Sequence, residues 1–173
     1  MTPLTSTVAA DFASYYQDAA KKILALVAPL SDDQIWTKPY LYGNSIGHLL
    51  LHLTGNLGYY VGTEIAGTGY VRNRPLEFTD ASRAPKSLLV RNFADAIGLV
   101  VAELHKQKES DWSLPYSGKG MDMANDRFRL FLHCHGHLCH HYGQMMYLVK
   151  EMERQGLRVD RSKFRAKRTA LRQ

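Results

Sequence analysis

Cysteine is scarce in this sequence: only Cys134 and Cys139 occur among its 173 residues. They lie five positions apart on one expected helix and face different sides of it, so they cannot pair without breaking the helix. The chain therefore has no disulfide framework, and two unpaired thiols are typical of a reducing compartment. The segment after Met1 also lacks a basic region followed by an apolar core. Both absences predict a cytoplasmic protein.

Long apolar runs are also missing, because no stretch reaches the ~18 residues that a membrane span needs. The sequence therefore predicts no membrane as a partner. The net charge of +6 comes from 22 basic and 16 acidic residues, but residues 150–173 hold nine of the basic and three of the acidic ones, so the rest is neutral. We expect one domain over residues 1–158 and a basic tail over residues 159–173. Short charged ends are most often simply solvated, which does not favour nucleic acid as a partner.

Several catalytic motifs are absent as well. The sequence contains no phosphate-binding loop G-x-x-x-x-G-K-[ST] and no H-E-x-x-H helix of a metalloprotease, and no strand-turn elbow surrounds a serine. No spacing singles out Glu64, Glu77 or Glu103 as a general base, so each is expected to be a solvated carboxylate. The chemistry must therefore come from other residues.

Helical periodicity, in contrast, is abundant. Apolar residues recur every three or four positions in four long segments, and no stretch alternates long enough to predict a strand with confidence. The expected helices cover residues 7–29, 45–66, 85–108 and 123–153, with a short helical turn at 31–36. Long connections separate the second helix from the third and the third from the fourth. This pattern predicts an all-α four-helix bundle that is not a simple up-and-down series.

The last expected helix carries five of the eight histidines. His137 and His141 are spaced i and i+4, which directs two imidazoles from adjacent turns toward one point. At 100° per residue, His133, His140, Gln144 and Cys134 lie within about 60° of His137, whereas His135 points to the opposite side. One face of this helix therefore has the residues to bind a metal ion, but it needs a ligand from another helix.

The second expected helix offers that ligand in His48 and His52, again at i and i+4. Asn56 and Tyr59 lie on the same face of this helix as His52 and form a polar stripe with it. Such a stripe is hard to explain as part of an apolar core. If His52 points inward with His137 and His141, three neutral nitrogens bind a divalent ion and leave a position for water or substrate, as in catalytic sites. Asn56, Tyr59 and Gln144 are then placed to orient the imidazoles or to hold substrate. The remaining candidate ligands are His48, His133, His140 and, more weakly, Cys134.

These residues resemble the motifs of the DinB-like superfamily of bacterial metal-binding four-helix bundles. Within that superfamily, the resemblance is strongest to a branch of unassigned function. The resemblance spans about residues 7–155 and rests on two motifs: Asn44-Ser45-Ile46-Gly47 followed by His52-Leu53-Thr54-Gly55-Asn56, and His137-x-x-x-His141-Tyr142-Gly143-Gln144. It implies a homodimer in which His52, His137 and His141 hold zinc or nickel.

Some members of that superfamily transfer a low-molecular-weight thiol to electrophiles, and others are thiol-dependent isomerases or are named as hydrolases. The resemblance therefore implies a small-molecule substrate and a metal-dependent thiol transferase. The alternatives are a metal-dependent hydrolase and a non-enzymatic metal-binding or interaction protein. Arg72 and Arg74 are candidates to bind a carboxylate of the thiol, because a guanidinium pairs with it through two hydrogen bonds.

Overall fold

Helices make up all the regular structure in the computed structural model, which describes residues 3–116, 118, 120 and 124–157. Within these residues there is no strand, and the only bridge of strand type joins Pro115 to Asp126. The prediction of an all-α fold is confirmed. The helices are α1 (Leu4–Val27), α2 (Asp32–Trp36), α3 (Ile46–Leu57), α4 (Leu76–Thr79), α5 (Lys86–Lys106) and α6 (Arg127–Arg154), with a π-helical turn η1 (Gly58–Thr63) and a 3-10 turn η2 (Glu109–Asp111).

Side-chain caps fix where three of these helices begin. Ser31 accepts a hydrogen bond from the third residue of α2 in a capping box, and Asp126 accepts one from the backbone of Arg129 in α6. Ser45 caps α3 and accepts a hydrogen bond from the backbone of His48. Each cap satisfies a backbone N–H that lacks a partner inside the helix. The caps of α3 and α6 thus stabilise the starts of the two helices that carry the histidines of the triad.

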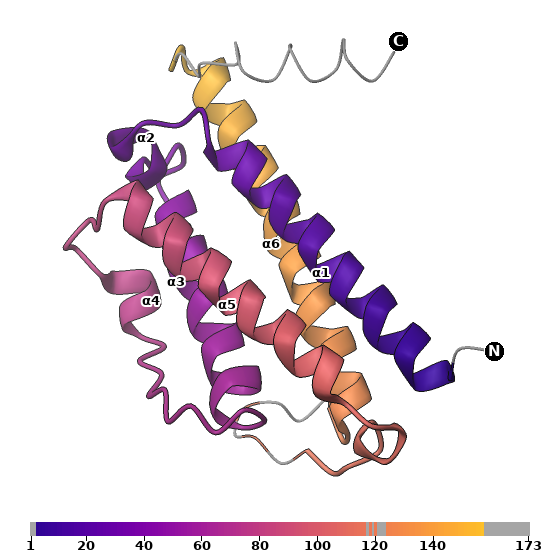
Figure 1. Ribbon diagram of the computed structural model, residues 1–173. Helices are drawn as coiled ribbons and strands as arrows, with labels where there is room; N and C mark the ends of the chain where they lie inside the picture. Colours follow the sequence, from indigo (N-terminus) through magenta and orange to yellow (C-terminus); the bar gives the residue numbers. More distant parts are fainter. Residues whose placement is uncertain (1–2, 117, 119, 121–123, 158–173) are drawn as a thin grey trace, which may run out of the picture.

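The four long helices α1, α3, α5 and α6 form a bundle (Figure 1). α1 packs against α5 and α6, and α3 packs against the same two helices. Figure 1 also shows that α1 and α6 run in one direction and that α3 and α5 run in the other. Because α3 and α5 are parallel, the chain must cross the length of the bundle between them. The expectation of long connections and of a bundle that is not simply up-and-down is confirmed.

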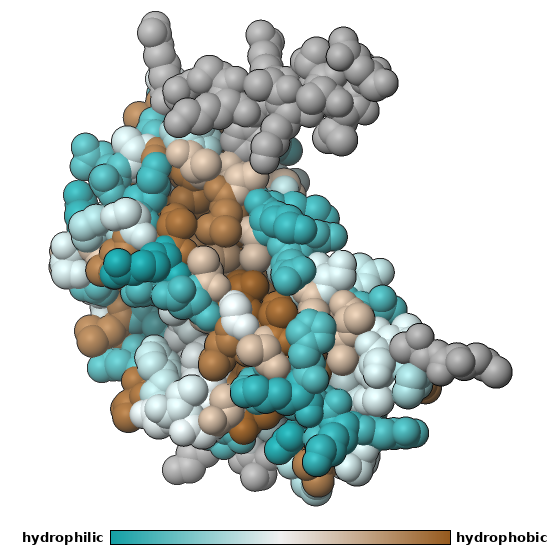
Figure 2. Space-filling view, viewed as in Figure 1, coloured by the Kyte–Doolittle hydropathy of each residue, from teal (hydrophilic) through white to brown (hydrophobic). Residues whose placement is uncertain are grey.

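The core lies between the four long helices and includes fully buried Tyr16, Phe93 and Phe131. The hydroxyl of Tyr16 donates to the carbonyl of Phe131 over 2.6 Å and so ties α1 to α6 just before the histidine-rich turns. Figure 2 shows a strip of hydrophobic residues along the middle of one face, between hydrophilic borders. Within the described residues no helix combines the length and the apolar character that a membrane crossing requires.

The second long helix departs from the prediction of one α-helix over residues 45–66. α3 ends at Leu57, and the chain continues as the π-helical turn η1. A π-turn is wider than an α-turn and occurs often at functional sites, because it changes the direction of the side chains that follow. Tyr59, Tyr60 and Thr63 of this turn all face one pocket, described below.

The connection from η1 to α5 is also more ordered than its sequence predicted. It contains the short helix α4, which packs against α3. The fourth long helix begins at Arg127, later than the predicted residue 123, and residues 121–123 lie outside the described part. The predicted basic tail, residues 159–173, lies outside it too.

Candidate metal centre

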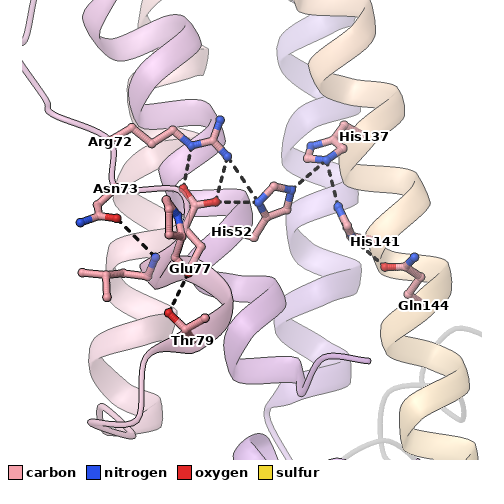
Figure 3. Close-up of polar contacts among 10 residues, drawn as sticks. His52, Arg72, Asn73, Glu77, Thr79, His137, His141 and Gln144 are labelled. Atoms are coloured by element: carbon pink, nitrogen blue, oxygen red, sulfur yellow. Dashed lines mark hydrogen bonds and ion pairs between the residues drawn. The ribbon is translucent and has the colours of Figure 1, made fainter. Parts of the chain in front are cut away.

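Three imidazoles converge between α3 and α6 (Figure 3). Nε2 of His137 lies 3.1 Å from Nε2 of His52 and 2.9 Å from Nε2 of His141. The potential ligand atoms of the three residues all lie within 4.8 Å of one another. His52 and His141 are buried, with 5% and 8% of their surface exposed, and His137 is half-buried. The structure thus brings together one histidine of α3 and two of α6.

The outer nitrogen of His52 is held by a carboxylate from the connection that contains α4. Nδ1 of His52 lies 2.7 Å from Oε2 of Glu77, and the side chains of both residues are 6% exposed. Arg72 donates to the same carboxylate from Nε over 2.6 Å and from Nη2 over 2.9 Å. Burial raises the pKa of Glu77, but the hydrogen bonds from His52 and Arg72 outweigh it and leave this pKa below its usual value. Glu77 is therefore an ionised acceptor in a buried Arg72–Glu77–His52 chain.

A glycine of α3 makes room for that carboxylate. A Cβ atom at position 55 would collide with Oε1 of Glu77. The ring of Phe78 covers the imidazole of His52 with centroids 4.8 Å apart. Gly55 and Phe78 thus fix the carboxylate against one edge of His52 and close one face of its ring.

The outer nitrogen of His141 has a partner on its own helix. Nδ1 of His141 lies 2.7 Å from Oε1 of Gln144, one turn further along α6. The amide nitrogen of Gln144 in turn lies 3.1 Å from Nε2 of His140, to which it donates. Gln144 therefore fixes the ring orientation of His141.

These outer partners determine where the protons of two imidazoles lie. Glu77 and the Oε1 atom of Gln144 can only accept, so His52 and His141 carry their protons on Nδ1 and direct a lone pair of Nε2 inward. Burial, followed by the neighbouring histidines, lowers the pKa of His137 to about 3. Burial also lowers the pKa of His141, to about 4, against the opposing hydrogen bond from Gln144. His137 and His141 are thus neutral at pH 7, the form in which histidine binds metal.

A pocket of about 800 Å³ opens beside His52 and His137. The turn η1 and the segment that follows it form much of its wall, and Asn56 and His133 lie on the helical side. Arg74 is on this wall with its guanidinium 5.6 Å from the ring of Phe78, and it makes no ion pair within the described residues. The pocket lining comprises His52, Asn56, Tyr59, Tyr60, Thr63, Gly69, Tyr70, Val71, Arg72, Arg74, Gly120, His133 and His137.

The other candidate ligands from the sequence lie elsewhere. His48 is buried, and its Nδ1 is 2.6 Å from the hydroxyl of Ser45, where it completes the cap of α3. His133 faces the pocket with its ring nearly parallel to that of His137, at 6.5 Å between centroids, but it is not in the converging group. His140 is exposed. Cys134 is fully buried in the core, and burial raises the pKa of its thiol to about 12.

One expectation about charged residues was wrong in part. Glu77 and Glu103 are buried, with 5% and 7% exposed, whereas Glu64 is exposed as predicted. Arg72, a candidate to bind a carboxylate of the thiol, lines the pocket, and its Nε and Nη2 donate to Glu77. The sequence held one signal for Glu77: a glycine in the middle of an apolar helix, one turn after His52, often marks close approach of another segment.

A bundle of four long helices with three histidines meeting between two of them defines a helical-bundle protein with a candidate metal centre. The family model described as the DinB superfamily matches residues 15–145. The chain therefore belongs to the DinB superfamily, and the triad and α4 lie within the matched part. No curated protein and no solved structure matches the chain.

Proposed function

We propose that this chain is a metal-dependent enzyme that joins a low-molecular-weight thiol to an electrophile. His52, His137 and His141 hold a divalent ion, zinc or nickel. The observation that carries this proposal is the convergence of three Nε2 atoms at the wall of an open pocket. Among the described residues, no further His, Cys, Asp or Glu joins this group. Three protein ligands beside a pocket are typical of catalytic sites, whereas structural sites close with four.

The donor set supports such an ion. Imidazole nitrogens suit zinc and nickel, and the Nε2 atoms are close enough together to share one ion at ~2.1 Å each. Glu77 and Gln144 hold His52 and His141 in the tautomer that leaves Nε2 free to bind. Partners of this kind raise the basicity of a ligand and fix its direction. The chemistry that a bound divalent ion supplies is Lewis acidity, which lowers the pKa of a neighbouring thiol.

The charge of the pocket supports an anionic substrate. Glu77 neutralises Arg72, and the lining contains no carboxylate among the described residues, so Arg74 is the uncompensated charge of this part of the wall. A guanidinium binds a carboxylate through two parallel hydrogen bonds. Arg74 is therefore the residue that anchors a carboxylate of the thiol, and Tyr59, Tyr60 and Tyr70 provide walls for its organic part.

In the proposed reaction the thiol gives up its proton to solvent, and its sulfur attacks an electrophilic carbon. A carbon–sulfur bond forms, and the leaving group departs with the electron pair of the bond that breaks. Arg74 orients the anionic end of the thiol during this attack. As metal ligands, His52, His137 and His141 would have no free Nε2 lone pair, so none of them acts as the base.

Turnover measurements test the proposal. The zinc- or nickel-loaded protein is incubated with an activated aryl chloride and a panel of carboxylate-bearing thiols and their amides. We expect metal-dependent turnover that is lost in His137→Ala and kept in His105→Ala, whose histidine is exposed on α5. Arg74→Gln should raise KM for the carboxylate thiols only, and Arg91→Gln, an exposed arginine of α5, should not.

No turnover with any thiol, together with ester or amide hydrolysis that requires the same histidines, would replace the transferase by the hydrolase. Metal binding without either reaction would favour a non-enzymatic metal-binding protein.

A further inference from the structure

Two buried polar side-chain atoms among the described residues have no hydrogen-bond partner: Oδ1 of Asn56 and Nδ1 of His137. Asn56 is 5% exposed, and both residues line the pocket beside the triad. Leaving a buried polar group unpaired is costly, because the group loses its hydrogen bonds to water, so each such atom calls for an explanation. Here the two atoms lie in the same part of the molecule.

The arrangement of α3 and α6 places the two residues near each other. Asn56 follows His52 by one helical turn, and the side chains of His52 and His137 meet across the two helices. α3 and α6 run in opposite directions (Figure 1), so the turn after His52 lies beside the turn before His137. His133, which precedes His137 by one turn, lines the same pocket as Asn56.

His137 differs from the other two histidines of the triad in the contacts of its outer nitrogen, Nδ1. Nδ1 of His52 is held by Glu77 and Nδ1 of His141 by Gln144, whereas Nδ1 of His137 is held by nothing. Nε2 of His137 lies between two Nε2 atoms that present lone pairs. Without an ion, its ring proton therefore belongs on Nε2, which leaves Nδ1 as an acceptor. In that tautomer, Nδ1 of His137 and Oδ1 of Asn56 are both acceptors and cannot pair with each other.

A bound ion reverses this relation. Nε2 of His137 can bind an ion only with its lone pair, so the neutral ring must then carry its proton on Nδ1. Nδ1 becomes a donor, and the carbonyl oxygen of Asn56 is the complementary acceptor. We propose that Asn56 is the positioning residue of His137, and that its Oδ1 accepts the Nδ1–H hydrogen bond when His137 is a metal ligand. Each of the three histidines then has one residue that fixes its tautomer. This inference rests on the proposed metal centre.

Zinc affinity measured by competition with a chromophoric chelator tests the inference. Asn56→Ala and Asn56→Leu remove the acceptor, and Leu nearly preserves the volume, so at least one of these variants should fold. We expect both to bind zinc about 10- to 100-fold more weakly than the wild type. Asn56→Asp keeps an acceptor and should bind within about threefold of the wild type. Asn92→Ala, an exposed asparagine of α5, is the matched control.

A spectroscopic measurement separates positioning from a general effect on the fold. In the zinc-loaded wild type and in Asn56→Asp, nitrogen-detected NMR should show the ring proton of His137 on Nδ1, protected from exchange with solvent. The same signal should exchange fast in Asn56→Ala or Asn56→Leu. Unchanged affinity and unchanged protection in these two variants would overturn the inference. A wild type that binds no zinc would instead overturn the proposed function, and this inference with it.

Discussion

Oε2 of Glu77 lies 2.7 Å from Nδ1 of His52, although the two residues belong to different elements, α4 and α3. The carboxylate also accepts two hydrogen bonds from Arg72. It therefore has two roles, since it fixes the tautomer of a candidate ligand and anchors the connection between η1 and α5 to the bundle.

Replacement of Glu77 should weaken both metal binding and the fold. Glu77→Ala leaves the buried guanidinium of Arg72 without its carboxylate partner, and we expect a loss of about 3–5 kcal/mol in the free energy of unfolding. Glu77→Gln keeps the volume but loses the charge, and we expect zinc affinity to fall about 10-fold. Urea denaturation and chelator competition measure the two effects. Glu64→Gln, at an exposed position near the end of η1, should change neither.

Addition of one methyl group at position 55 should also weaken both metal binding and the fold. In Gly55→Ala the new Cβ collides with the carboxylate of Glu77 and must push it away from His52. We expect a lower free energy of unfolding, by about 1–3 kcal/mol, and weaker zinc binding. In Gly98→Ala the new Cβ meets no atom within 4 Å. This control should gain up to ~1 kcal/mol, because alanine favours the helix. Equal stability of the two variants would show that Gly55 is not needed for this close approach.

Acid should destabilise the metal-free protein before it protonates His137 and His141 in the folded chain. The pKa values of His137 and His141 are about 3 and about 4 in the folded chain, whereas an unfolded histidine titrates near pH 6.5. Between these values the unfolded state binds more protons than the folded state, so the free energy of unfolding falls as pH drops from about 6.5 toward 4. Urea denaturation at a series of pH values measures the slope.

Asn at positions 137 and 141 removes these two titrating groups and is the control for the pH experiment. The double variant His137→Asn/His141→Asn should show a shallower slope over the same range. Some slope should remain, because burial also lowers the pKa of His48 and His135. A double variant with the same slope as the wild type would contradict the lowered pKa values.

The sequence was sufficient to predict the fold class and to select the histidines that meet. The helical period places His52 on the inward face of its helix, and it places His137 and His141 together on the inward face of theirs. This works because an α-helix is regular enough for the angle between two side chains to be calculated from their spacing in the sequence. The resemblance then distinguished these three from His48, His133 and His140. These rules of helix geometry were sufficient because each of them uses the sequence of a single helix.

Glu77 and η1 could not be predicted in the same way. Glu77 approaches His52 through the path of a connection, and that path depends on the packing of α4 on α3 rather than on any local pattern. The π-turn at Gly58–Thr63 has no composition of its own and depends on the packing of its neighbours. An exposed and a buried glutamate look alike in a sequence, which is why Glu77 and Glu103 were both expected at the surface.

Removal of residues 159–173 should leave the domain intact. The family match ends at residue 145, and the triad, Glu77 and Gln144 all precede that position. We expect the truncated chain to keep the metal content and the free energy of unfolding of the full chain. We also expect the full and the truncated chain to have equally low affinity for nucleic acid at low salt. A marked drop in this affinity on truncation would assign the tail a nucleic-acid partner.

Metal content tests the proposed centre most directly. Elemental analysis of the purified wild type, loaded with zinc or nickel and passed through a desalting column, should give one ion per chain. His52→Ala and His137→Ala should lose it, while His133→Ala and His48→Ala, which change histidines outside the triad, should retain it. Full metal content in both His52→Ala and His137→Ala would contradict the assignment of the site to these histidines.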